Sequence, residues 1–309
     1  MSILLIFENK NPDPWYKLLK EKLPGGTIEV YPDVKDASLV DFIVCWKPKK
    51  DIFNKYPNVK VVQSVGASID HITNSQTLQP NTVVTRIVDT KLTQDMWEFL
   101  VAVVLGELKN TSLYMAQQKE KKWKQHRYAS FKDVTVTILG LGSIGGYVAQ
   151  NFSDFGFKVK GWSNSKKQLS GVTSFHGKEG FKDCLRDTNF LINLLPLTKD
   201  TRDILNADIL GSLATSAFLI NVGRGEHLVE EDLLQLLNSS RLSGALLDVF
   251  REEPLPEKHP FWEHGKIKIT PHVASLTNIE SAAEQVIENY RNFLNKKTLV
   301  NVVSLKKGY

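Results

Sequence analysis

The chain has few cysteines and no long apolar stretch. Its 309 residues include two cysteines, Cys45 and Cys184, each within or beside an apolar run. Two such thiols exclude a disulfide framework and are typical of buried cysteines in a reducing compartment. The first apolar run, Ile3–Phe7, is followed at once by Glu8 and predicts a strand rather than a signal peptide. No run approaches the ~18 apolar residues of a membrane span, so we expect a cytoplasmic protein without a membrane partner.

The chain also has no strong excess of positive or negative charge. The net charge is +5, and 42% hydrophobic with 24% charged residues is ordinary for a globular protein. One lysine-rich segment, Lys119–Lys124, also contains Glu120 and Trp123. We interpret it as a solvated helix end rather than a nucleic-acid patch, and we expect no nucleic-acid partner. We also expect no metal site.

The length favours about two domains. Short apolar runs in the first hundred residues predict strands at Ser2–Phe7, Thr27–Tyr31, Asp41–Trp46, Val59–Val65 and Thr82–Ile87. Six more are predicted at Val134–Leu139, Phe157–Trp162, Phe190–Leu194, Phe218–Val222, Ala245–Val249 and Ile267–Ile269. Helix-compatible runs separate most of them. The pattern predicts an α/β protein: a doubly wound parallel sheet of the Rossmann type, with a second, smaller, flavodoxin-like β/α domain. We place the smaller domain at 1–97 plus 277–309 and the dinucleotide-binding domain at 98–276.

Three helices carry specific signals. Asp13-Pro14 predicts a helix start with Asp13 as the N-cap. Thr277 and Glu280 form a predicted capping box for the last helix. One face of that helix should bury Ile279, Ala283, Val286, Tyr290 and Phe293. The run Asp95–Leu108 is apolar almost all round, which predicts a helix buried on all sides, as at a domain or subunit interface.

A glycine-rich turn follows the predicted strand Val134–Leu139. Gly140, Gly142 and Gly145 have the spacing G-x-G-x-x-G, and the helix-compatible run Ser143–Phe155 comes next. The strand before and the helix after give the motif the context that dinucleotide binding requires. Because the turn lies near the middle of the chain, a domain's worth of residues precedes the nucleotide domain.

Three polar residues stand just beyond predicted strands, where an open α/β sheet binds its ligands. They are Arg224, Glu253 and His272. Each alone has an ordinary structural interpretation, but together they suit the reduction of a 2-oxo acid. A dinucleotide supplies the hydride, and a histidinium supplies the proton. A carboxylate beside the imidazole favours its charged form, and a guanidinium binds the substrate carboxylate and carbonyl.

Four motifs resemble those of the D-isomer-specific 2-hydroxyacid dehydrogenases, in that family's order. They are Gly140-Leu-Gly-Ser-Ile-Gly145, Ile220-Asn-Val-Gly-Arg-Gly225, Leu247-Asp-Val-Phe-Arg-Glu-Glu-Pro254 and Thr270-Pro-His-Val-Ala274. The likeness is greatest to the branch that reduces glyoxylate and hydroxypyruvate. It rests on Trp46-Lys-Pro48, Val88-Asp-Thr90, Trp162-Ser163, Leu191-Ile-Asn-Leu-Leu-Pro196 and Gly308-Tyr309.

The resemblance implies roles for individual residues. Arg224 would bind substrate, His272 would be the acid/base and Glu253 its partner. The substrate site would include Trp46 and a loop, Gly66, Ala67 and Ser68, that offers backbone N–H groups to a carboxylate. The cofactor would contact Gly140, Gly142, Ser143, Ile144, Gly145, Leu195, Pro196, Val222 and Asp248. The resemblance also implies a homodimer built around the helix that contains Phe99–Leu105.

The segment after the second strand of the nucleotide domain lacks a carboxylate. NAD enzymes usually place an acidic residue there, about 20 positions past the glycines, to bind the ribose hydroxyl. This chain has Ser163, Asn164, Ser165 and Lys166 with Lys167 instead. Hydroxyl, amide and ammonium groups suit a 2′-phosphate, so we expect NADPH as the cofactor, with NAD as the alternative.

The sequence therefore predicts an NADPH-dependent reductase of a small 2-oxo acid, with glyoxylate and hydroxypyruvate as leading substrates. A reductase of a bulkier 2-oxo acid and a dinucleotide-sensing binding protein without turnover remain as alternatives. A sensor would not need the proton donor that His272 provides, and a methyltransferase would not explain the N-terminal β/α domain.

Overall fold

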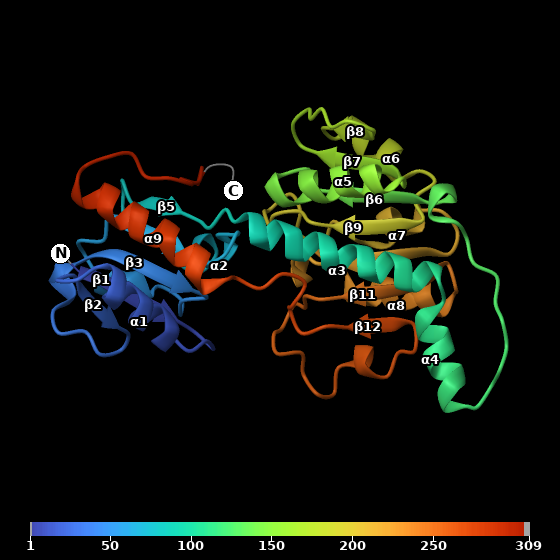
Figure 1. Ribbon diagram of the computed structural model, residues 1–309, viewed down its shortest axis with the longest axis horizontal. Coiled ribbons are helices and arrows are strands. Elements are labelled where there is room, and N and C mark those ends of the chain that lie inside the picture. Colours follow the sequence, from blue (N-terminus) through green and yellow to red (C-terminus); the bar gives the residue numbers. More distant parts are fainter. Residues whose placement is uncertain (1, 306–309) are drawn as a thin grey trace. The chain divides into compact units, whose positions relative to one another are not determined.

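The computed structural model describes residues 2–305 (Figure 1). The chain divides into two compact units, residues 1–92 with 277–309 and residues 93–276. The boundary after Leu92 lies inside the helix α3 (Thr90–Leu108), and the predicted division after residue 97 lies in the same helix. Of the quoted motifs, Gly308-Tyr309 lies outside the described residues.

The first unit contains a five-stranded parallel sheet in the order β2-β1-β3-β4-β5. This is the flavodoxin-like order that the sequence predicts. Its strands are β1 (Ser2–Phe7), β2 (Thr27–Val30), β3 (Val40–Trp46), β4 (Val61–Ser64) and β5 (Val83–Thr85). Its helices are α1 (Asp13–Lys22), α2 (Asp70–Thr73) and α9 (Ile279–Leu294). Helices α1 and α9 pack side by side on the sheet, in one apolar core with β1 and β3 (Figure 1).

The predicted face of α9 is confirmed, but two predicted caps are wrong by one residue. Ala283, Val286 and Tyr290 are buried, with Ile279 and Phe293 packed against them. The N-cap of α9 is Asn278, whose side chain accepts a hydrogen bond from the Ser281 N–H at 3.0 Å. Thr277 instead donates to the carbonyl oxygen of Val65 at 3.2 Å. The N-cap of α1 is Pro12, because Asp13 already has helical geometry.

The second unit contains a seven-stranded parallel sheet in the order β12-β11-β10-β9-β6-β7-β8. The strands are β6 (Thr135–Leu139), β7 (Lys158–Ser163), β8 (Val172–His176), β9 (Phe190–Asn193), β10 (Ala217–Asn221), β11 (Leu242–Leu247) and β12 (Ile267–Ile269). The helices are α3, α4 (Thr111–Lys119), α5 (Ser143–Phe155), α6 (Glu179–Leu185), α7 (Ala207–Gly211) and α8 (Glu230–Asn238). Residues of α3 and α5 share one core, and residues of α6, α7 and α8 share another. Such two-sided covering confirms the doubly wound sheet.

Two strand predictions need correction. The sequence analysis predicted six strands here and missed β8, an edge strand that pairs only with β7. Its residues are partly or fully exposed, so it lacks the apolar run used to find the others. The strand β11 begins at Leu242 and ends at Leu247, so Asp248 lies beyond it rather than inside it.

The apolar helix α3 is not buried on all sides within this chain, contrary to expectation. Met96, Leu100, Val104 and Leu108 form one buried face. The remaining apolar side chains, Phe99, Val101, Val103 and Leu105, are only partly buried. One face therefore covers the sheet, and the apolar side chains beside it are partly exposed within this chain.

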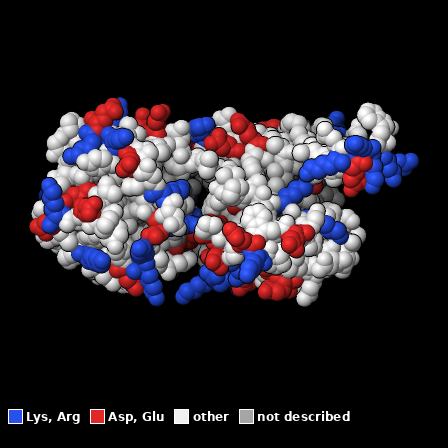
Figure 2. Space-filling model, turned by 90° about the horizontal axis from the view of Figure 1, so that it is seen from below, with Lys and Arg blue, Asp and Glu red and all other residues white. Residues whose placement is uncertain are grey.

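The lysine-rich segment is exposed within the chain, at the end of α4. Acidic and basic side chains are interspersed in Figure 2, with several blue side chains gathered at the right-hand end. Lys119 ends α4, and residues 119–124 are exposed. Lys122 forms an ion pair with Glu120 at 2.6 Å within the segment.

Both cysteines are buried free thiols, as predicted. Burial raises the pKa of Cys45, and it raises the pKa of Cys184 to about 12. Across residues 2–305, no single helix has the length and apolar character to cross a membrane, although α3 and α4 together, bent by 62°, pass on length and composition alone. The same part of the chain holds no cluster of three or more His, Cys, Asp or Glu suited to a metal ion.

Candidate active site

The glycine turn joins β6 to α5 as the motif requires. Gly140 has a φ of +101°, and a Cβ there would lie 2.7 Å from the carbonyl oxygen of Leu194. A Cβ on Gly145 would lie 1.9 Å from the carbonyl oxygen of Gly140, so only glycine allows α5 to start this close to the turn. A Cβ on Gly142, the N-cap of α5, would meet nothing within 4 Å. Backbone atoms therefore lie close to Gly140 and Gly145, whereas the space beside Gly142 is empty.

This open space fits a dinucleotide pyrophosphate. Helix N-termini present unpaired N–H groups and a positive dipole end, and Gly142 lets a ligand approach the backbone there. Ser143 and Ile144 form the first residues of α5. Leu195 and Pro196 follow β9, which neighbours β6 at the point where the strand order reverses. Ligands of doubly wound sheets bind at such a switch point, beyond the carboxyl ends of the strands.

The segment after β7 carries no carboxylate, as its sequence indicated. Ser163 is the last residue of β7 and is 8% exposed. Its hydroxyl donates to the carbonyl oxygen of Ser165 at 2.7 Å, so it holds the turn in shape. Asn164, Ser165 and Lys166 are exposed. A 2′-phosphate would therefore meet the side chains of Asn164, Ser165 and Lys166 rather than the Ser163 hydroxyl, which is already bonded.

A buried polar network fixes the backbone of Arg224 beyond β10. His227 is completely buried, and its Nε2 faces the carbonyl oxygen of Pro196 at 3.3 Å, so Nε2 carries the hydrogen and Nδ1 accepts. Nδ1 lies 3.1 Å from the Arg224 N–H and 2.8 Å from Nδ2 of Asn193. Asn221 Nδ2 donates to the Arg224 carbonyl oxygen at 3.0 Å. The His227 ring and the Asn221 amide thus bond both ends of the Arg224 backbone, and Asn193 joins the two side chains to each other.

No motif in the sequence indicated this network. Asn193 and Asn221 end the adjacent strands β9 and β10, and both are fully buried. Asparagine is uncommon in the core of a sheet. An asparagine at the end of an apolar strand run is therefore the sequence signal that could have indicated this network. Val222, predicted to contact the cofactor, is buried directly after β10.

The loops of Arg224 and Glu253 lie against each other. A Cβ on Gly225 would lie 1.9 Å from the carbonyl carbon of Phe250. This position therefore requires glycine, and the close approach brings the loop after β10 against the loop after β11. Glu253 Oε1 accepts a hydrogen bond from the Phe250 N–H at 3.2 Å.

His272 and Glu253 form the pair that the sequence predicts. His272 Nδ1 lies 2.9 Å from Oε2 and 3.1 Å from Oε1 of Glu253. Because a carboxylate only accepts, Nδ1 carries a hydrogen and Nε2 is the ring nitrogen left for chemistry. The two side chains are 32% and 20% exposed, so the pair is accessible yet partly shielded from solvent.

Asp248 holds the segment that carries His272. It is 1% exposed, and its Oδ1 accepts from the Thr270 hydroxyl at 2.6 Å and from the Val273 N–H at 2.9 Å. Its Oδ2 accepts from the Ala274 N–H at 3.0 Å. Its carbonyl oxygen accepts from the His272 N–H at 2.8 Å. These bonds position the histidine, a role that the sequence did not indicate.

The residues predicted to bind the substrate carboxylate lie together in the first unit. A Cβ on Gly66 would lie 2.6 Å from the ring of Trp46, so the indole rests on this glycine. The Gly66 N–H donates to the Ser64 hydroxyl at 3.1 Å and is used within the loop. The Ala67 N–H makes no hydrogen bond within residues 2–305. Arg86 Nη1 donates to the Ala67 carbonyl oxygen at 3.0 Å, which steadies the loop.

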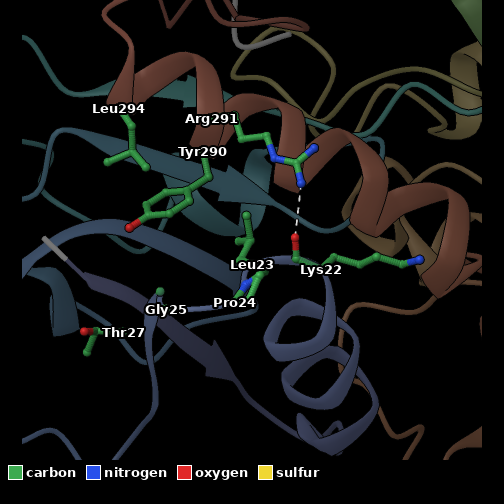
Figure 3. Close-up of a pocket in the computed structure, with 9 residues that line it drawn as sticks. Lys22, Leu23, Pro24, Gly25, Thr27, Tyr290, Arg291 and Leu294 are labelled. Carbon is green, nitrogen blue, oxygen red and sulfur yellow. Dashed lines mark hydrogen bonds between the residues drawn. The ribbon is translucent and has the colours of Figure 1, made fainter.

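A separate pocket lies elsewhere in the first unit. Figure 3 shows it between the end of α1 and α9, with Tyr290, Arg291 and Leu294 on one side and Lys22 and Leu23 on the other. It opens where the chain enters β2, at the amino end of that strand. No predicted site residue lines it, and parallel sheets bind ligands at the opposite, carboxyl edge.

Known proteins match this chain over nearly all of its length. The family model described as D-isomer specific 2-hydroxyacid dehydrogenase, NAD binding domain, matches residues 101–274. A glyoxylate/hydroxypyruvate reductase A of Yersinia enterocolitica is 36% identical over the whole of both chains. That of Photorhabdus laumondii is 37% identical over 96% of each.

Several solved structures match the whole chain, among them the following two. An NADPH-dependent glyoxylate/hydroxypyruvate reductase of Sinorhizobium meliloti, in complex with NADP and sulfate, has a TM-score of 0.93 and 34% identity over 100% of both chains. A D-isomer specific 2-hydroxyacid dehydrogenase of Xanthobacter autotrophicus, in complex with NADPH and MES, has a TM-score of 0.92 and 32% identity over 100% of this chain and 99% of that one. The chain therefore belongs to the D-isomer-specific 2-hydroxyacid dehydrogenase family of NAD(P)-dependent oxidoreductases.

Proposed function

We propose that the protein uses NADPH to reduce a small 2-oxo acid, with glyoxylate and hydroxypyruvate as the leading substrates and glycolate and D-glycerate as products. The observation that carries the proposal is the His272–Glu253 pair beside the loop of Arg224, at the same sheet edge as the glycine turn. The names of the similar reductases support this substrate class, and the NADP and NADPH complexes support the cofactor.

Each residue of the site has a distinct task in this reaction. When bound, the reduced nicotinamide supplies the hydride that attacks the carbonyl carbon. Arg224 binds the substrate carboxylate and carbonyl with its planar fork of donors, which orients the 2-oxo group. His272 delivers a proton from Nε2 to the developing alkoxide, and Glu253 stabilises the imidazolium through Nδ1.

The preference for NADPH rests on the turn after β7. Its exposed groups are an amide, a hydroxyl and ammonium groups, and no carboxylate stands among them. An acidic side chain there would repel a 2′-phosphate and accept from the free hydroxyl of NADH. We propose Asn164, Ser165 and Lys166 as the contacts, with Ser163 shaping the turn.

A homodimer accounts for the uncovered apolar surface of the second unit. Beyond α3, Met115 is 60% exposed and Tyr128 is 62% exposed. Trp123 is 98% exposed, so the chain itself gives it almost no apolar contact. Large apolar side chains with exposed fractions this high are typical of a protein–protein interface. We propose that a second copy covers it, and that the protein works in the cytoplasm, where both free thiols stay reduced.

Replacing His272 with alanine should abolish most turnover without loss of cofactor binding. Removal of a general acid typically costs ~10²–10⁴-fold in rate. Steady-state oxidation of NADPH with glyoxylate gives kcat, and quenching of protein fluorescence by NADPH gives the Kd. His272→Gln should be as slow, because an amide cannot deliver a proton at neutral pH. Near-normal kcat in either variant would refute the assignment of His272.

Cofactor choice should change with one carboxylate in the turn after β7. We predict that wild type prefers NADPH and that Asn164→Asp moves the preference towards NADH. Losing one hydrogen bond to a charged group, about 1.5–3 kcal/mol, lowers NADPH affinity about ten- to a hundredfold. Asn164 suits this test because it is exposed, whereas Ser163 is buried and bonded.

The matched control is Gln168→Asp, which adds the same charge to an exposed residue further along the loop. Titrations of all three proteins with NADPH and NADH give the two Kd values. The turn is not the discriminator if wild type already prefers NADH, or if Asn164→Asp and Gln168→Asp shift the ratio equally.

Truncation of Trp123 should weaken self-association. A large aromatic side chain buried in an interface typically contributes about 2 kcal/mol or more, which corresponds to about a thirtyfold change in Kd. Sedimentation velocity over a dilution series should show a dimer for wild type and a shift towards monomer for Trp123→Ala. The control is Trp262→Ala, since Trp262 is 52% exposed but belongs to the short helix Pro260–Trp262 rather than to α3, α4 or the segment after α4. A monomeric wild type would contradict the proposed homodimer.

A further inference from the structure

The sheet of the first unit has its own topological switch point. Its order, β2-β1-β3-β4-β5, reverses between β1 and β3. Sheets of this order bind ligands in the crevice beyond the carboxyl ends of those two strands. Trp46 is the last residue of β3, and the chain leaving β1 runs beside it, because the Glu8 N–H donates to the Trp46 carbonyl oxygen at 3.1 Å. Two residues further on, this segment places Lys10 at the switch point.

The ammonium group of Lys10 is held over the indole. Its Nζ lies 4.3 Å from the centroid of the Trp46 ring. Burial and the nearby charge of Lys47 both lower the pKa of Lys10. Within residues 2–305, Lys10 forms no ion pair with a carboxylate. An ammonium group without a carboxylate partner, at the sheet edge where such folds bind ligands, suits an anion.

The same indole also touches the predicted substrate loop. Gly66 lies against the six-membered ring of Trp46, and the ring of His71 packs on it with centroids 4.9 Å apart. Trp46 thereby links two features that suit anions: the loop with the Ala67 N–H and the ammonium group of Lys10. A substrate carboxylate held at the loop leaves the other end of the molecule to extend along the indole.

We propose that Lys10 binds a second anionic group at the far end of the substrate. The inference rests on the proposed 2-oxo acid reduction and adds to its substrates 2-oxo acids with a terminal carboxylate or phosphate. Neither glyoxylate nor hydroxypyruvate carries such a group, so a switch-point lysine would contribute nothing to their recognition. Lys10 is in this sense a specificity-determining residue.

The test compares 2-oxo acids whose far end is charged (the charged acids) with 2-oxo acids whose far end is uncharged (the neutral acids). The pairs are oxaloacetate with 2-oxobutanoate, 2-oxoglutarate with 2-oxopentanoate, and phosphohydroxypyruvate with hydroxypyruvate. For each pair, NADPH oxidation gives the ratio of kcat/KM for the charged acid to that for the neutral one. We expect wild type to favour the charged member of at least one pair by about tenfold, mainly through KM. The pair that shows the largest ratio distinguishes carboxylate from phosphate.

Three variants assign that preference to Lys10. Lys10→Met keeps the aliphatic stem without the charge and should bring the ratio close to one. Lys10→Arg keeps the charge and should keep most of the preference. Lys17→Met removes the same charge from an exposed residue of α1 and should leave the wild-type ratio and activity unchanged.

Turnover without preference for any charged acid would overturn the inference and leave the proposed function standing. If Lys10→Met and Lys17→Met gave equal ratios of kcat/KM, the inference would likewise be overturned and the proposed function would stand. A complete lack of NADPH oxidation with glyoxylate and with all six acids would overturn the proposed function, and this inference with it.

Discussion

The catalytic end of the second unit depends on the hydrogen bonds that Asp248 makes to the segment 270–274. Three of them go to its carboxylate and one to its carbonyl oxygen, and together they hold His272 at a φ of +55°. A left-handed conformation costs a non-glycine residue about 1 kcal/mol or more, so the surrounding bonds must impose it. The result is an imidazole with Nδ1 on Glu253 and Nε2 available to a substrate.

The other loops of the site are fixed by the same means. Arg224 gains its backbone position from His227, Asn193 and Asn221, which are completely buried. Gly225 then allows close contact with the loop of Glu253. Buried hydrogen-bonded groups therefore set the reacting side chains, whereas the turn after β7 and the lysines near Trp46 are more exposed. The residues proposed for catalysis are therefore held by buried hydrogen bonds, whereas the residues proposed to select cofactor and substrate lie in more exposed segments.

The sequence was sufficient to predict the features that depend on a local residue pattern. Apolar runs indicated most strands, and glycine spacing indicated the turn before α5. The pairing of His272 with Glu253 followed from their places after β11 and β12. The analysis missed β8 because an edge strand buries too little to need an apolar run. It missed His227 and the bonds of Asp248 because they join segments distant in sequence, and no periodicity records such contacts. The predicted cap of α9 was off by one residue because the Thr277 hydroxyl bonds the carbonyl oxygen of Val65 instead.

The most direct test of the central claim is the kcat of Asp248→Asn, measured with its NADPH Kd and its melting temperature. An asparagine amide cannot accept the Ala274 N–H while its oxygen accepts from Thr270 and Val273, so the segment should lose its fixed geometry. Misorientation of a catalytic group can cost about a hundredfold in rate. The account predicts a fall in kcat of at least about tenfold in a folded protein that still binds NADPH. Unchanged kcat, or lost NADPH affinity with full kcat, would contradict it.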